Sequence, residues 1–270
     1  MIPEWLYTLA GIALCILLIP YVLGPILIFC TLRFRMPPTV IAVEPRVHPL
    51  PAEARNYLAE AYRGLTAEGF ELVGTMLLPD LVPNVKTLFA MYTNRTNSDM
   101  AMSAIIVAQG GAGGELKTSY VEFVRRFDDG VVVQTNNSAE LSAFKRMPGE
   151  FTTKVWHIRD IRRLYGLHQQ LSERFRQRGQ PVNRLDAEYG GDALQYVAKA
   201  VLEETFRDQV GTGYLAENSG GFRPSLKGAL IMAWQELWPV KGIRRWRERR
   251  RAERLLVDLE TRPSPASGGR

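Results

Sequence analysis

Histidine is the side chain best suited to acid–base catalysis and metal binding near neutral pH, and this 270-residue chain has only three. His157 and His168 are eleven residues apart, which places them on one face of a predicted helix over 157–178. The rise of an α-helix would separate them by roughly 16 Å, so the two rings cannot bind one metal ion. His48 stands alone in a proline-rich segment. We therefore predict no metal site and no cofactor.

His168 also lies in the apolar stripe of that predicted helix, close to Tyr165. The simpler interpretation is a histidine of the hydrophobic core that makes one hydrogen bond. The alternative is a catalytic base, with His168 or His157 acting alongside a neighbouring carboxylate. The chain has no nucleophile-elbow, zinc-protease or paired-carboxylate motif. We therefore assign no catalytic residue.

Residues 111–118, Gly-Ala-Gly-Gly-Glu-Leu-Lys-Thr, nearly match the loop that wraps nucleotide phosphates. In that motif a glycine precedes the lysine, and the loop opens a helix. Here Leu116 replaces the glycine, and the residues from Ser119 to Phe127 alternate as a β-strand does. We interpret this stretch as a flexible hairpin loop rather than a nucleotide site.

The chain has two cysteines, Cys15 and Cys30, and both fall within an apolar N-terminal run. The remainder therefore has no disulfide, no thiolate nucleophile and no cysteine-based metal site. From Trp5 to Leu32 no side chain is charged, and this length exceeds the ~20 apolar residues that a membrane-spanning helix needs. We predict a transmembrane helix over residues 5–32.

Two alternatives to a retained span are weaker. A cleaved signal peptide has a basic start, a shorter apolar core and a small-residue cleavage site, and this run shows none of them. A re-entrant hairpin would break at Pro20 and Pro25, but each arm would be too short to cross. The run is followed by Arg33, Arg35 and Arg46 and preceded by no basic residue. This asymmetry favours a single-pass protein with its N-terminus outside and its soluble domain in the cytoplasm.

Residues 36–51 contain five prolines and are expected to form an extended linker. Residues 52–222 have the length of one soluble domain. This domain is expected to begin with a helix over 52–68 that has one apolar stripe, made of Ala54, Leu58, Ala61 and Leu65.

Five strands with a period of two follow, at 70–78, 85–93, 100–108, 116–127 and 131–135. Asp129-Gly130 indicates a hairpin turn between the last two. The connections are too short for parallel crossovers, which favours an antiparallel meander. Helices over 157–178 and 186–210 come after the strands. The order is typical of an α+β fold, here an antiparallel sheet of about five strands flanked by helices and preceded by the transmembrane helix.

The excess positive charge of the chain lies in its C-terminal part. Residues 226–260 are expected to be helical, with an apolar start and a basic continuation, and residues 261–270 to be disordered. Between 241 and 254 there are eight Lys or Arg residues and two Glu, a difference of +6 that equals the net charge of the whole chain. The rest of the protein is therefore neutral.

We interpret this segment as a contact with the membrane surface, since tryptophan prefers the headgroup boundary and basic side chains are attracted to anionic lipid headgroups. The residues assigned to the contact are Trp234, Trp238, Lys241, Arg244, Arg245, Trp246, Arg247, Arg249, Arg250 and Arg251. Two other interpretations stay open. One is a helix packed on the domain's own core, and the other is a nucleic-acid or acidic-partner site in the arginines of 244–251.

The sequence favours a non-enzymatic module, anchored in the membrane, that binds a partner or ligand at the cytoplasmic membrane surface. The reason is that it has no catalytic constellation and a neutral domain with a predicted lipid contact at each end. The expected partners are the lipid bilayer and a protein, and nucleic acid is not expected. The main alternative is a membrane-associated enzyme of unknown class that uses His168 or His157.

Overall fold

The structure is a computed structural model that describes residues 3–44, 50–82, 85–108, 115–140, 142 and 144–261. The predictions for His48, for the glycine-rich loop at 110–114 and for the tail at 262–270 lie outside the described residues. The chain forms two compact units. The sheet unit comprises Pro37–Leu141, Arg146–Glu204 and Glu248–Arg270, and the helical unit comprises Met1–Met36, Ser142–Lys145 and Thr205–Arg247.

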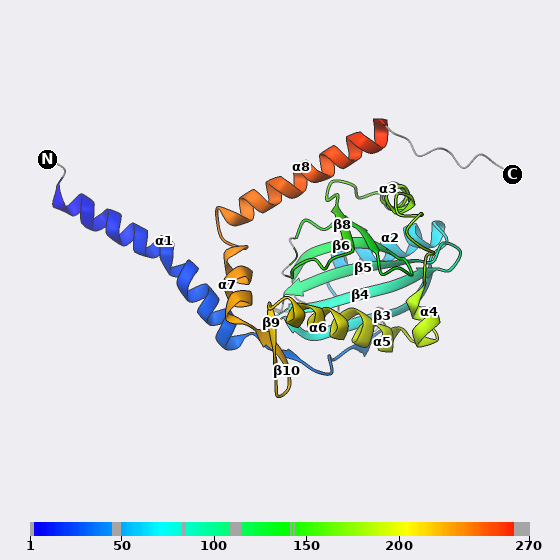
Figure 1. Ribbon diagram of the computed structural model, residues 1–270, viewed down its shortest axis with the longest axis horizontal. Coiled ribbons are helices and arrows are strands. Elements are labelled where there is room, and N and C mark those ends of the chain that lie inside the picture. The colour runs from blue at the N-terminus through cyan, green and yellow to red at the C-terminus, as the bar shows by residue number, and fades with distance from the viewer. Residues whose placement is uncertain are drawn as a thin grey trace. The chain divides into compact units, whose positions relative to one another are not determined.

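The sheet unit is built on a seven-stranded sheet with the order β2-β3-β4-β5-β6-β7-β8 (Figure 1). Its strands are β2 (Ile41–Ala42), β3 (Glu71–Val82), β4 (Val85–Asn94), β5 (Asp99–Ala108), β6 (Glu115–Arg126), β7 (Val132–Asn136) and β8 (Glu150–Lys154). Neighbouring strands are antiparallel except β7 and β8, which are parallel. The fold is α+β as predicted, but the antiparallel meander of about five strands is wrong in both strand number and direction. The long connection from Asn136 to Glu150 permits the parallel return of β8.

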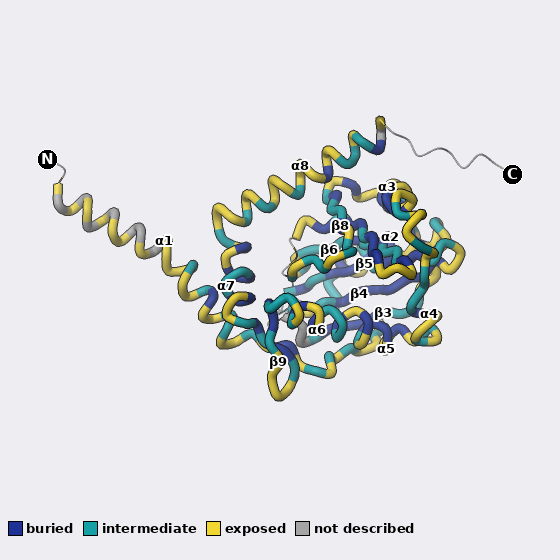
Figure 2. The backbone as a smooth tube through the Cα atoms, viewed as in Figure 1, coloured by how far each residue is buried: buried dark blue, intermediate teal, exposed yellow. Residues whose placement is uncertain are grey.

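One face of this sheet is covered by α2 (Ala52–Ala67) and α3 (Ile161–Glu173), which share a core with the strands. The predicted stripe of α2 is confirmed, because its four members, Ala54, Leu58, Ala61 and Leu65, are buried. Figure 2 shows the buried residues concentrated in the strands. The last turns of α8 (Val240–Thr261) add Ala252 and Leu259 to this core.

The predicted continuous helix over 186–210 is wrong. The chain forms α4 (Arg184–Tyr189), α5 (Ala193–Tyr196), the π-helical turn η1 (Val197–Glu203) and α6 (Glu204–Gly211). The first break lies at Gly190 and Gly191, whose φ angles are +58° and +85°. Only glycine adopts these angles without strain, and in this conformation it ends a helix.

The helical unit contains α1 (Glu4–Thr31), α7 (Leu226–Trp234) and a small antiparallel sheet with the order β1-β10-β9. Its strands are β1 (Phe34–Arg35), β9 (Leu215–Asn218) and β10 (Gly221–Pro224). The second half of α1 packs on α7. The indole Nε1 of Trp234 donates a hydrogen bond to the carbonyl of Tyr21 at 2.9 Å, Ala233 lies close to Gly24, and Pro25 is buried.

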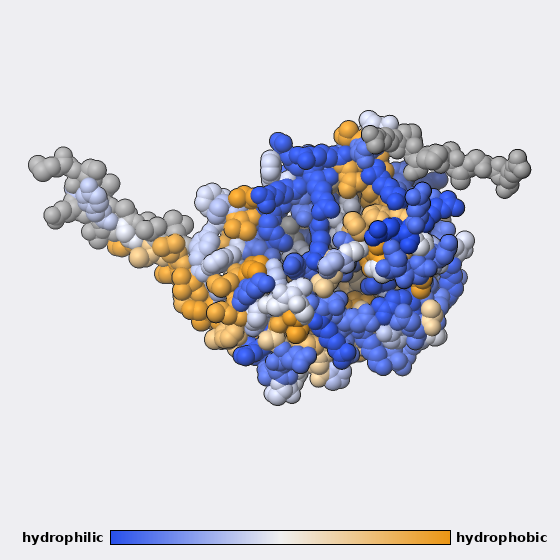
Figure 3. Space-filling model, viewed as in Figure 1, coloured by the Kyte–Doolittle hydropathy of each residue, from blue (hydrophilic) through white to orange (hydrophobic). Residues whose placement is uncertain are grey.

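The structure contradicts the predicted transmembrane helix at 5–32. Across the described residues, none of the helices combines the length and the apolar character needed to cross a membrane. The prediction assigned the whole apolar run to lipid, whereas part of it packs on α7. Apolar surface gathers along the second half of α1 in Figure 3, where Val22, Leu23 and Leu27 are exposed. The predicted single-pass membrane topology is therefore wrong. The localisation with the N-terminus outside depended on that topology and is wrong too.

Leu65→Ala tests the packing of α2 on the sheet. Leu65 is completely buried, so the substitution leaves a cavity and should lower the free energy of unfolding by about 2–5 kcal/mol. The measurement is urea unfolding followed by circular dichroism. Thr66→Ala, at the exposed neighbouring position, should change the value by no more than about 0.5 kcal/mol. Equal effects of the two substitutions would contradict the packing.

Candidate functional site

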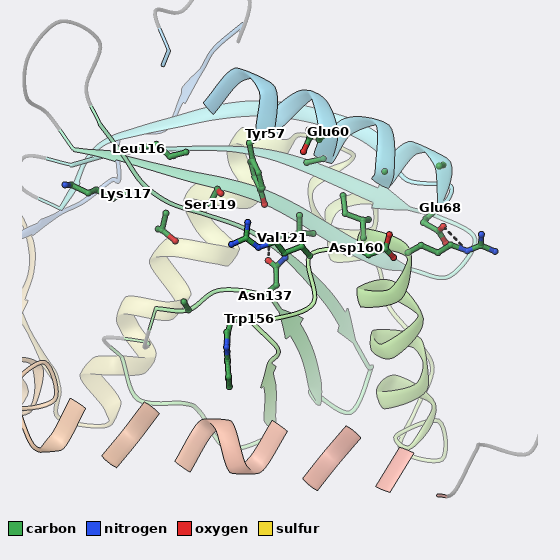
Figure 4. Close-up of a pocket in the computed structure, with 18 residues that line it drawn as sticks. Tyr57, Glu60, Glu68, Leu116, Lys117, Ser119, Val121, Asn137, Trp156 and Asp160 are labelled. Atoms are coloured by element: carbon green, nitrogen blue, oxygen red, sulfur yellow. Dashed lines mark hydrogen bonds and ion pairs between the residues drawn. The ribbon is translucent and has the colours of Figure 1, made fainter. Parts of the chain in front are cut away.

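A cleft of about 1100 Å³ opens on the sheet unit where α2, the first half of β6 and the segment leading into α3 face one another (Figure 4). Its walls come from four separate stretches, which are residues 57–68, 116–121, 137–139 and 156–162. Sites for small molecules measure about 300–1,000 Å³. The cleft is therefore large enough for a ligand of that size or for a short piece of another chain.

Asn137 fixes one wall of the cleft. Its Oδ1 accepts a hydrogen bond from the amide of Val121 at 2.8 Å, and its Nδ2 donates to the carbonyl of Ile158 at 3.1 Å. The side chain therefore ties β6 to the segment before α3. Asp160 then begins α3 as its N-cap, because its carboxylate accepts a hydrogen bond from the amide of Arg163 at 2.7 Å. The helix predicted over 157–178 is thus shorter at both ends.

Tyr57, Trp156 and Arg159 are among the residues that line the cleft. Figure 4 shows Tyr57 pointing from α2 toward Val121 and Asn137. Its hydroxyl is buried and has no hydrogen-bond partner within the described chain. Burial raises the pKa of Tyr57 above its ordinary value, and the positive charge of Arg159 offsets only part of this effect. The hydroxyl therefore stays protonated, as a donor that faces no acceptor.

Most of the charged groups on the cleft wall are already paired. Glu68 lies 3.9 Å from Arg162, and Lys117 lies 2.7 Å from Glu115. The Asp160 carboxylate is used as the helix cap. Arg159 is exposed, and no residue of the described ranges forms an ion pair with it. Its guanidinium is therefore available to a ligand.

Trp156 forms the aromatic part of the wall. One face of its ring is covered by Arg249 of α8, whose guanidinium carbon lies 5.0 Å from the ring centre. His157 packs edge-on against the same ring and is itself exposed. The indole ring is thus held in place by its neighbours.

His168 lies in a polar network sealed within the core. Arg125 donates two hydrogen bonds to the Asp99 carboxylate, at 2.6 and 2.7 Å, and Tyr165 donates a third at 2.8 Å. The Nδ1 of His168 contacts the hydroxyl of Thr135 at 3.1 Å. Its Nε2 lies 3.6 Å from Asp99, which is too long for a hydrogen bond. The side chains of His168 and Asp99 are completely inaccessible to solvent.

The charge states of this network follow from burial and contact. Burial alone would raise the pKa of Asp99, but the two hydrogen bonds and the positive charge of Arg125 outweigh that effect and lower the pKa. Burial lowers the pKa of His168 below 6.5, and the attraction of Asp99 offsets only part of this. The network therefore holds an ionised Asp99 paired with Arg125 beside a neutral His168. Because no solvent reaches His168, the interpretation as a core histidine fits its position, and a substrate has no access to it.

Of the ten residues assigned to a membrane-surface contact, four contact other residues of their own unit. Within the helical unit, Trp234 bonds to Tyr21, Lys241 lies 2.7 Å from Glu236, and Arg244 donates to Gln235 at 2.6 Å. Arg249 covers Trp156 in the sheet unit. The other six members of the set, Trp238, Arg245, Trp246, Arg247, Arg250 and Arg251, are exposed. Their contact with lipid headgroups stays a prediction, as does a contact of Arg244–Arg251 with an acidic partner.

Sequence reasoning missed Tyr57, Trp156 and Arg159. Nothing in their spacing marks them, because the fold brings them together from α2 and from the segment before α3. Asn137, which follows β7, also lines the cleft. Residues 115–126 form the strand β6, which agrees with the rejection of a nucleotide loop there. Within the described ranges, no cluster of three or more His, Cys, Asp or Glu side chains could hold a metal ion.

Comparison with protein-family models, with curated proteins and with solved structures finds no match to this chain. The interpretation of the cleft therefore rests on its geometry.

Asp99→Ala tests the buried network. It leaves the partly buried Arg125 without its counter-charge and should lower the free energy of unfolding by about 3–5 kcal/mol. Glu71→Ala is the matched control, because it removes the exposed ion pair with Arg95 and should cost less than about 1 kcal/mol. Chemical denaturation measures both values. A loss for Asp99→Ala as small as that of the control would exclude the assigned role.

The pH dependence of stability tests the state of His168. Its pKa is lowered in the folded chain, so the unfolded chain takes up the proton first as the pH falls below 6.5. Stability should therefore decrease as the pH falls from 6.5 toward the folded pKa. His168→Leu should remove this part of the slope in urea unfolding between pH 7.5 and pH 5, whereas His157→Leu should keep it. A wild-type slope in His168→Leu would mean that other groups are responsible.

Proposed function

We propose that the protein is a non-enzymatic binding module and that the cleft between α2, β6 and α3 holds its ligand. One observation carries this proposal. Tyr57 and Arg159 present hydrogen-bond donors to the cleft without acceptors, beside the fixed ring of Trp156. Buried polar groups in folded proteins are nearly always paired, so an unpaired buried hydroxyl in a cleft is a good candidate for a ligand contact.

The arrangement of titratable groups supports binding without chemistry. His168 and Asp99 are sealed in the core, and the cleft wall includes neither histidine nor cysteine. His157 is exposed but does not line the cleft. A general base must come within hydrogen-bond reach of its substrate, and His168 has no route to one.

A fragment screen by protein-observed NMR on the full chain tests the proposal. Ligands should shift the amide signals of Ser119, Asn137 and Arg159, which border the cleft. Signals that move only at the smaller apolar hollow of about 490 Å³, lined by Tyr62 and Leu72, would refute the proposed site.

Two matched substitutions localise the binding. Ala139→Trp places a bulky ring at the mouth of the cleft and should weaken each ligand at least about tenfold. Ala187→Trp makes the same change at an exposed position of α4 and should leave the affinity unchanged. Equal affinities in the two variants would show that the ligands bind elsewhere.

A further inference from the structure

One edge of β6 is only partly paired. On one side, β5 pairs with β6 from Glu115 to Arg125. On the other side, β7 pairs only with residues from Glu122 to Arg126. The chain leaves the sheet after Asn136, and no strand in the described chain takes its place beside residues 115–121. This unpaired edge is the floor of the cleft, because residues 116–119 and Val121 line it.

The direction of the free backbone groups can be derived from Val121. Its amide donates to Asn137 Oδ1 at 2.8 Å, and its carbonyl accepts from the Asn137 amide at 3.2 Å. Both groups of Val121 therefore point away from β5. Because this direction repeats every second residue along a strand, the N–H and C=O of Ser119 also point away from β5 and into the cleft.

An unpaired edge of this kind can take up another strand. Exposed strand edges attract extended chains, and proteins usually protect them with charge, proline or a covering element. Glu115 and Lys117 place two opposite charges on this edge, which pair with each other, and no proline lies between residues 115 and 121. The edge stays accessible at the floor of the cleft, whose polar groups at Tyr57 and Arg159 lie beside it.

We propose that the ligand of the cleft is an extended segment of a partner protein, which adds to β6 as a strand in the position that β7 leaves empty. This inference rests on the proposed function and specifies its ligand. Main-chain hydrogen bonds to Ser119 supply the affinity, as in other cases of strand addition. A carboxylate side chain of the segment, Asp or Glu, accepts from the Tyr57 hydroxyl and pairs with Arg159.

The test begins with a selection of random twelve-residue peptides on the full chain. Peptides that shift the Ser119 and Asn137 amide signals are then made with one N-methyl group at each position in turn. If the peptide adds as a strand, the effect of methylation on affinity should alternate from one position to the next, because every second amide of an added strand points toward β6. Methylation of those amides should weaken binding about a hundredfold, since it removes a donor and adds a clash, and methylation between them should have little effect.

Variants of the protein test the same geometry from the other side. Ser119→Pro removes the amide that points into the cleft and spares the ladder with β5, so the chain should fold and bind about tenfold more weakly. Ser119→Thr keeps the amide and is the matched control. Tyr57→Phe and Arg159→Gln should each weaken acidic peptides and leave their Asp→Ala or Glu→Ala versions unaffected. Arg163→Gln, an exposed neighbour outside the cleft, should have no effect.

The outcomes separate this inference from the proposed function. Peptides that bind in the cleft but show no period of two on methylation would overturn strand addition and leave the cleft as a site for side-chain recognition. A selection without cleft-binding peptides, together with fragments that bind there, would also overturn it. A failure of both screens would overturn the proposed function as well. Because the methylation series uses the wild-type chain, it decides the matter even if Ser119→Pro does not fold.

Discussion

The burial of the Asp99 carboxylate is the constraint on which the sheet unit depends. An ion removed from water costs several kcal/mol unless charges and hydrogen bonds replace its hydration. Arg125 on β6 and Tyr165 on α3 supply that replacement. The pairing of β5 with β6 and the position of α3 over the sheet are therefore coupled through one side chain. Since the first residues of α3 form a wall of the cleft, the geometry of the cleft depends on this network too.

The strand β6 has two halves with different neighbours. Near Arg125 it is paired on both sides and covered by α3. Near Ser119 it is paired on one side only, and the other side faces the cleft. Asn137 marks the boundary, because it replaces a strand partner for Val121 and turns the chain toward α3. The fully paired half is thus part of the core, and the partly paired half has the edge at which we propose that a ligand binds.

The features that depend on local patterns could be predicted from the sequence. The stripe of α2, the turn at Asp129-Gly130 and the α+β order of elements are set by spacing and by glycine. Features that depend on distant contacts could not. The parallel strand β8 follows a long connection without a clear pattern, and the apolar run of α1 has the same composition whether it packs on α7 or spans a bilayer. The cleft is formed by four separate stretches of the chain, so no sequence motif indicates it.

The fold buries His168, and it leaves His157, Cys15 and Cys30 exposed but outside the cleft. His168 attracts attention in the sequence, yet it lies in the core, while the cleft presents Tyr57, Trp156 and Arg159, which are common on any protein surface. The proposed recognition through main-chain groups needs no reactive side chain in the cleft. An edge that binds by its N–H and C=O groups requires only that the strand pattern be kept and that the edge stay open. A module that binds in the proposed way therefore needs no catalytic motif, and the feature on which its binding depends is the open edge of β6.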